Sequence, residues 1–252
     1  MPITALIALR TVAVAALLAE TAARAGTGAV SWCHPGGSRA QRAALALLLG
    51  WVTLGFLAFG LALGGVLTAH AVLAGTVALL AASGGLRLRP FLLVRVMRGA
   101  AGAGPWWAAA GIAATVSLWP LLVAPESTTD CFIYHLGLPW HALRLHKLPP
   151  DAAPWLFHVP ALFDFTQVIP LLLHDDRLAR WSGVGCLLAA QALWAERARA
   201  RGRPRAAWLG ALFVLALPPV LRVTTTAKCD LAAVALFAAG AGLCAGRNVL
   251  VG

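Results

Sequence analysis

The sequence predicts an all-α fold, a polytopic bundle of transmembrane helices with interfacial helices in its first large outer loop. Of its 252 residues 60% are hydrophobic and 12% are charged, whereas an ordinary globular domain has about 25% charged residues. No Asp, Glu, Lys or Arg occurs between Ala43 and Leu86, a run long enough for two crossings at about 20 residues each. Because backbone polar groups must be satisfied inside lipid, spans of this kind are expected to be helices.

Hydropathy predicts seven spans along the chain. They cover residues 3–24, two crossings within 43–86, and then 103–124, 181–195, 206–221 and 230–246. Gly64-Gly65 is the expected turn inside the long uncharged run. These two glycines and Gly60 are also expected at helix contacts, since small residues let membrane helices approach closely. No basic region precedes the first apolar stretch, so a cleavable signal peptide is not expected.

The basic residues indicate topology rather than a nucleic-acid partner. A formal net charge of +11 would suggest nucleic-acid binding in a soluble protein. Here the arginines gather in three short segments beside spans, at 24–42, 87–98 and 197–205. Cytoplasmic loops of membrane proteins carry such an excess of Lys and Arg. Placing all three segments in the cytoplasm puts Glu126–Arg180 and Arg222–Cys229 on the outer side.

The chain is predicted to have two parts. Residues 1–100 hold the N-terminal transmembrane helices and a basic cytoplasmic loop, and residues 101–252 hold a second transmembrane core. Within the core, Ala161–Leu173 is apolar but too short to span, which favours an interfacial helix. Pro139 is expected to end a short helix that begins near Asp130, because the residue before a proline avoids helical geometry.

Residues with useful chemistry concentrate in the outer segments. Six of the nine acidic residues and five of the seven histidines lie between Glu126 and Asp176. Asp130 and Asp230 are both predicted on the outer face, each at the end of a spanning helix. A carboxylate there can act as a general base, and nearby cations can stabilise a departing phosphate. The further candidates for substrate binding are Tyr134, His135, His141, Arg222 and Lys228.

Several other chemistries lack the residues that they need. The sequence contains no HExxH and no CxxC pair, so no metal ligands are predicted and no motif requires a divalent metal. Walker, GxGxxG and GxSxG motifs are also absent, which removes support for nucleotide and classical serine-hydrolase chemistry. The five cysteines show no zinc spacing and are interpreted as free, small apolar residues.

The run from Thr129 to Pro139 reads T-D-x-x-x-Y-H-L-x-x-P. It resembles a segment of bacterial membrane glycosyltransferases of the GT-C superfamily, in the branch related to protein mannosyltransferases. The similarity continues through Phe157–Phe163 and through Thr224–Leu231, where the family has a Thr-Ala-x-x-Asp-Leu element. It therefore covers the chain from about Trp106 onward and makes residues 101–252 a GT-C-like, catalytic-type core.

The resemblance implies a transferase in a bacterial inner membrane. It would take a sugar from a polyprenyl-phosphate carrier and pass it to an acceptor of unknown identity at the outer face. Asp130 would be the catalytic base and Asp230 would shape the same site. The expected partners are membrane lipid and the lipid-linked donor, with no separate cofactor.

Two alternatives to an active transferase stay open. Family members usually continue through more spans, whereas this sequence ends at Gly252, so a truncated or inactive GT-C-like protein without turnover is the first. The second is a proton- or cation-coupled transporter that uses the same aspartates and histidines as a relay.

Overall fold

The computed structural model describes a helical protein in which no strand occurs among the described residues, so the all-α prediction is confirmed. Those residues are 3–33, 38–85, 131–149, 163–203, 217–224, 226–227 and 230–247, with single positions at 119, 124, 129, 209, 210 and 213. The predicted span 103–124, most of the span 206–221 and the proposed boundary at residue 100 lie outside the described residues.

Two of the described helices are long and apolar enough to cross a membrane. They are α1 (Ile3–Cys33) and α2 (Arg39–Leu63), with candidate spans at Leu6–Trp32 and Gln41–Leu63. The first helix is longer than the predicted span of residues 3–24. Ser38 fixes the start of α2, because its side chain accepts a hydrogen bond from the Gln41 amide at 3.1 Å and so satisfies one free N–H of the first turn.

The two long helices touch backbone to backbone. A Cβ atom added at Gly26 would overlap the carbonyl oxygen of Ala46, and one added at Gly50 would overlap that of Ala22. The order of these contacts makes α1 and α2 antiparallel. In each helix the small residues are four positions apart, which is the spacing that lets membrane helices approach closely.

The chain turns at the predicted glycines, and no described helix packs closely on Gly60 or Gly65. Gly64 caps α2, and Gly65 has a positive φ of 70°, a conformation that glycine adopts at little cost. No atom of the described residues lies within 4 Å of a Cβ added at Gly60 or Gly65. Among the described residues the close helix contact is made by Gly26 and Gly50.

The next helix, α3 (Ala69–Ala82), begins after Thr68, whose hydroxyl accepts a hydrogen bond from the Ala71 amide at 3.2 Å. Its 14 residues extend about 21 Å at 1.5 Å per residue. The hydrocarbon core of a bilayer is about 30 Å thick. The second predicted crossing of the uncharged run is therefore a helix that falls short of this thickness.

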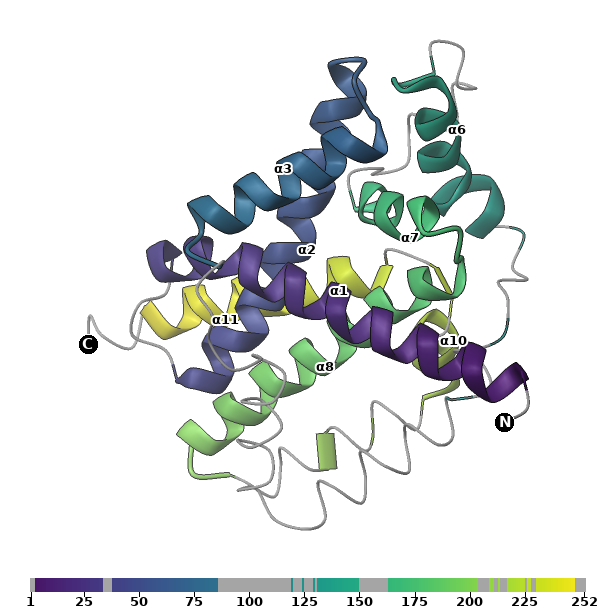
Figure 1. Cartoon of the computed structure of the whole chain (residues 1–252). Coiled ribbons are helices and arrows are strands. Elements are labelled where there is room, and N and C mark those ends of the chain that lie inside the picture. The colour runs from purple at the N-terminus through teal and green to yellow at the C-terminus, as the bar shows by residue number, and fades with distance from the viewer. Residues whose placement is uncertain are drawn as a thin grey trace.

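The second half of the described chain consists of shorter elements and two longer helices (Figure 1). They are η1 (Cys131–His135), α6 (Gly137–Leu145), η3 (Asp164–Gln167), α7 (Val168–Leu172), α8 (Arg177–Ala200), α10 (Pro218–Thr224) and α11 (Asp230–Arg247). The expectation that Pro139 ends a helix is wrong, because Pro139 lies in the first turn of α6. The amides of a first turn have no partner inside the helix, so a proline there removes no hydrogen bond.

The described part of the segment predicted as an interfacial helix, residues 163–173, is mostly buried at its start, whereas Leu173 at its end is exposed. All four residues of η3 are buried. Phe165 packs edge-to-face on Phe59 of α2, with ring centroids 5.2 Å apart and an interplanar angle of 81°. Val168 joins the same apolar cluster, together with Ala62 and Leu138. The segment that begins at Asp164 thus fills the space between α2, α6 and the start of α8.

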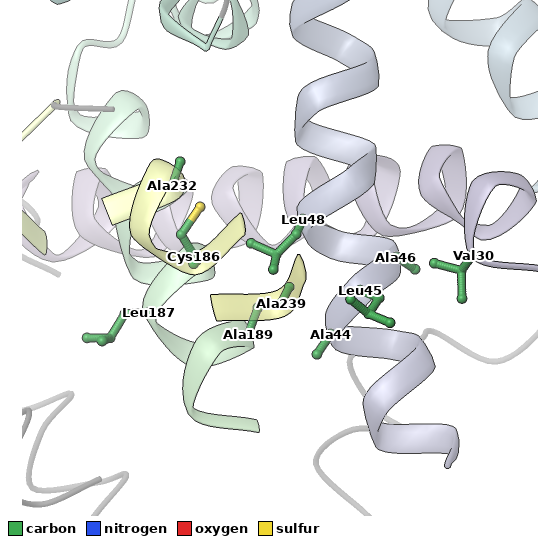
Figure 2. Packing of buried hydrophobic residues seen from close by; sticks show 11 residues of the cluster. Val30, Ala44, Leu45, Ala46, Leu48, Cys186, Leu187, Ala189, Ala232 and Ala239 are labelled. Atoms are coloured by element: carbon green, nitrogen blue, oxygen red, sulfur yellow. The ribbon is translucent and has the colours of Figure 1, made fainter. Parts of the chain in front are cut away.

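One apolar cluster joins the first helices to the last (Figure 2). Leu45 and Leu48 of α2 pack with Cys186 of α8 and with Ala232 and Ala239 of α11. Many members of this cluster are alanines, so the helices meet with little side-chain volume between them. Through these contacts α8 and α11 dock on the pair formed by α1 and α2.

The described chain has two distinct ends. At one end the Ser38 hydroxyl donates to Glu196 of α8 at 2.7 Å, and Arg24 donates to the Gly85 carbonyl after α3 at 3.0 Å. The C-terminal ends of α1, α3, α8 and α11 lie on the left of Figure 1, whereas α6, α7 and α10 lie on the right. The basic segments near residues 24–42 and 197–203 therefore share one end of the molecule.

Candidate functional site

A π-helical turn follows Asp130 directly. It spans Cys131–His135, and the Leu136 amide closes it by donating to the Cys131 carbonyl at 2.7 Å. Such turns are rare and occur frequently at functional sites. Asp130 itself and the Tyr134 side chain lie outside the described residues. The local geometry of the predicted site is therefore visible from Cys131 onward.

The structure brings together Cys131 and Ala227, which lie close in the sequence to the two predicted aspartates. Cys131 is fully buried and packs in a small apolar cluster with Leu136, Ala179 of α8 and Ala227. Cys131 follows Asp130, and Ala227 lies three positions before Asp230. The two segments therefore share one apolar contact, although they are almost 100 positions apart in the sequence.

Asp230 is the first residue of α11 and its side chain is exposed. An acidic residue in a first helical turn is favoured by the helix dipole. Arg222 is exposed in the last turn of α10, and Lys228 lies outside the described residues. The candidate cation Arg222 and the candidate carboxylate Asp230 thus flank the buried Ala227 along the chain.

His135 forms a buried pair with Asp164, which is not among the site residues predicted from the sequence. Its ring Nδ1 lies 2.8 Å from Oδ1 of Asp164, and the side chains are 10% and 2% exposed. An ionised carboxylate only accepts hydrogen bonds, so pairing with an ionised Asp164 requires Nδ1 to be the donor. In a neutral imidazole with its proton on Nδ1, Nε2 offers a lone pair. The clue in the sequence was an acidic residue inside the apolar run Ala161–Leu173.

A second polar contact lies beside this pair. Gln167 donates to the Ser182 hydroxyl at 3.1 Å, and both side chains are buried. Residues three apart in a 3₁₀ helix project in the same direction, so Asp164 and Gln167 lie on one side of η3. The Gln167 side-chain oxygen and the Thr166 hydroxyl have no hydrogen-bond partner among the described residues. The interior next to η3 is therefore polar, although apolar clusters surround it.

His141 is placed apart from the buried pair. It is exposed on α6, whereas the adjacent Ala142 is buried. Arg180, which is not among the predicted site residues, is 4% exposed. It directly follows Ala179, a member of the apolar cluster that contains Cys131. Among the described residues no group of three or more His, Cys, Asp or Glu could hold a metal ion.

These features describe an all-helical protein in which two helices could cross a membrane by length and composition, with a buried imidazole–carboxylate pair beside a contact between two distant segments. No protein-family model matches the chain, and neither curated proteins nor solved structures give a match. Function must therefore be inferred from the residues themselves.

Proposed function

We propose that this chain is a GT-C-type glycosyltransferase, or the N-terminal part of one, that lies in a bacterial inner membrane as a polytopic bundle. It transfers a sugar from a polyprenyl-phosphate carrier to an acceptor at the outer face. The observation that carries the proposal is the shared cluster of Cys131 and Ala227. It joins the motif that begins at Thr129 to the element that leads to Asp230, and these are the two segments that the family resemblance pairs.

Exposed apolar side chains support placement in a membrane. A helix that is apolar on all sides is either a core helix or a membrane span, and contact with lipid would cover such side chains. Large hydrophobic residues are exposed on several helices, including Leu6 and Leu17 of α1, Phe56 of α2, Leu73 of α3, Leu188 of α8 and Phe237 of α11.

The distribution of charge supports the proposed topology. The end of the molecule that holds Ser38, Glu196 and the basic segments is the cytoplasmic end under the positive-inside rule. The turn at Gly64-Gly65 is at the other end of α2, where it meets the residues after α6. The predicted site then opens on the outer side, where a lipid-linked donor is available and soluble nucleotide sugars are not.

The proposed reaction assigns a role to each group. Asp130 takes the proton of the acceptor hydroxyl, and the hydroxyl oxygen forms a bond to C1 of the sugar. The bond between C1 and the carrier phosphate oxygen breaks, and its electron pair leaves with the polyprenyl phosphate. Arg222 and Lys228 bind that phosphate. Asp230 shapes the pocket for the sugar and acceptor.

The experiment follows a radiolabelled polyprenyl-phosphate sugar into product with the full chain in reconstituted membranes. Asp130→Asn should lower the transfer rate by roughly 10²–10⁴, the usual contribution of a general base, and should leave membrane insertion intact. Arg222→Gln and Lys228→Gln should raise KM for the donor more than they lower kcat. Glu196→Gln is the matched control, because this acid binds Ser38 at the other end of the molecule.

Each outcome separates one alternative from the others. Full turnover by Asp130→Asn would remove the assignment of the base. An inserted wild-type chain without transfer would favour an inactive copy or fragment. Movement of protons or cations across the membrane without transfer would favour the transporter.

A further inference from the structure

We infer that Asp164 is a positioning residue that holds His135 with its Nε2 atom free to accept a hydrogen bond from a hydroxyl group of the substrate. This inference rests on the proposed function and adds to it a group that recognises the sugar or the acceptor. It assigns a role to Asp164, which lies 29 positions after His135 in the chain.

The exposure of the two partners indicates which one meets a ligand. The Asp164 side chain is 2% exposed and the His135 side chain is 10% exposed. Both side chains are buried, and the imidazole keeps more exposed area than the carboxylate. A buried carboxylate that binds one ring nitrogen fixes the tautomer and the orientation of a histidine that acts through its other nitrogen.

Asp164 is held by a rigid support. Gln167, on the same side of η3, is hydrogen-bonded to Ser182 of α8 at 3.1 Å. The Ser182 hydroxyl in turn donates to the Ala179 carbonyl at 2.7 Å. Phe165 anchors the other side of η3 on α2. The carboxylate is thus fixed relative to α8, which also carries the Ala179 that packs on Cys131.

The location of His135 links the pair to the proposed transfer site. His135 ends the π turn that begins at Cys131, and Cys131 shares an apolar cluster with Ala227. One turn further along α8, a Cβ added at Gly183 would lie 3.0 Å from the carbonyl oxygen of Thr224, the last residue of α10. The first turns of α8 therefore pack near both Cys131 and Thr224, and His135 directly precedes Leu136, a member of the same apolar cluster as Cys131.

The test uses one variant of each partner and a matched control in the full-length chain. His135→Asn keeps an N–H donor near the position of Nδ1, so it can still bind Asp164, but it lacks the Nε2 lone pair. Asp164→Asn keeps the size of the side chain but no longer requires a proton on Nδ1. Asp175→Asn is the control, because Asp175 is another buried acid and binds Arg177 instead of a histidine.

Two measurements are needed. In ¹⁵N-histidine-labelled protein, the His135 ring should show a protonated Nδ1 and an unprotonated Nε2, and Asp164→Asn should lose this preference. In the transfer assay, His135→Asn and Asp164→Asn should each lower kcat/KM by roughly 10–100-fold, the effect of leaving a buried polar contact unmade. Asp175→Asn should transfer at close to the wild-type rate, and thermal unfolding should show that all three variants fold.

The outcomes distinguish this inference from the proposed function. A His135 ring protonated at Nε2 in the wild type would overturn the inference at any transfer rate. Wild-type rates in both His135→Asn and Asp164→Asn would also overturn it. If the wild type transfers no sugar and the ring has the expected tautomer, the proposed function fails, while the positioning of His135 by Asp164 stands. If Asp164→Asn does not fold, the transfer rate of His135→Asn, which keeps the hydrogen bond to Asp164, decides whether the inference holds.

Discussion

His146 binds both backbone groups of Leu67. The Leu67 amide donates to the His146 carbonyl at 2.9 Å, and Nδ1 of the His146 ring donates to the Leu67 carbonyl at 3.0 Å. The residues are 79 positions apart. A third bond follows, from the Leu148 amide to the Ala62 carbonyl at 3.1 Å. The end of α6 is thereby fastened to the turn between α2 and α3, so the first helices support the segment that carries the candidate site.

Loss of the His146 ring should destabilise this attachment. We expect His146→Ala to lower the free energy of unfolding by about 1 kcal/mol, the net value of a typical hydrogen bond. His146→Asn should stay close to wild type, because asparagine tolerates the left-handed backbone found at this position, where φ is 57°, and keeps an N–H donor. Denaturant unfolding in detergent micelles measures the difference. Equal losses in both variants would show that the ring hydrogen bond contributes nothing.

The contact between α1 and α2 should not tolerate a methyl group. Gly50→Ala places its Cβ on the Ala22 carbonyl oxygen, so the helices must separate, and we expect a loss of about 1–3 kcal/mol or more. Gly60→Ala in the same helix is the control, since no atom of the described residues lies within 4 Å of its added Cβ. That control should be neutral or stabilising by up to about 1 kcal/mol. A lower melting temperature for Gly60→Ala than for Gly50→Ala would contradict the close contact between α1 and α2.

The ion pair inside α1 should behave as a pair with a buried carboxylate and a partly exposed guanidinium. Glu20 is 3% exposed, and its carboxylate lies 2.6 Å from Nε of Arg24. Arg24→Met leaves the Glu20 carboxylate without this partner, and we expect a loss of about 3–5 kcal/mol. The double variant Glu20→Leu with Arg24→Met should lose less than Arg24→Met alone, because no buried charge is left behind. A double-mutant cycle with additive losses would rule out coupling between the two side chains.

The two ends of the molecule should be accessible from opposite sides of a membrane. Single cysteines at Val66 and Leu145 should react with a membrane-impermeant maleimide on intact cells. Cysteines at Ser38 and Arg201 should react only after permeabilisation. All four positions are exposed in the structure, so differences in labelling report sidedness in a background without other cysteines. The reverse pattern would invert the topology and place the candidate site in the cytoplasm.

Local signals in the sequence carry part of the fold. Ser38 is not among the sequence predictions, which begin the second span near residue 43, but a hydroxyl before an apolar run is a local signal for the start of α2, because it satisfies a free amide. Gly64-Gly65 indicates the turn, because Gly65 adopts a positive φ. Both features depend on residues close together in the chain, so a single sequence carries the information.

The remaining features depend on which distant residues meet. The close contact uses Gly26 and Gly50 instead of Gly60, although all three are small residues in apolar helices, because the choice depends on how the helices cross. The acid that pairs with His135 is Asp164. An acidic residue in an apolar run indicates a buried partner, but it does not say which of the five histidines between Glu126 and Asp176 that partner is.

The glycine contact between α1 and α2 also bears on the order in which the protein assembles. These helices are consecutive, and five residues separate the end of α1 from the start of α2. A contact between neighbours in the chain closes a short loop and forms quickly. The pair can therefore associate during synthesis, before α8 and α11 have been made. The later helices α8 and α11 can then pack on the surface of α2 that carries Leu45 and Leu48. A defect at Gly50 would therefore appear first in newly made chains, in which α8 and α11 fail to dock and the chain is degraded early.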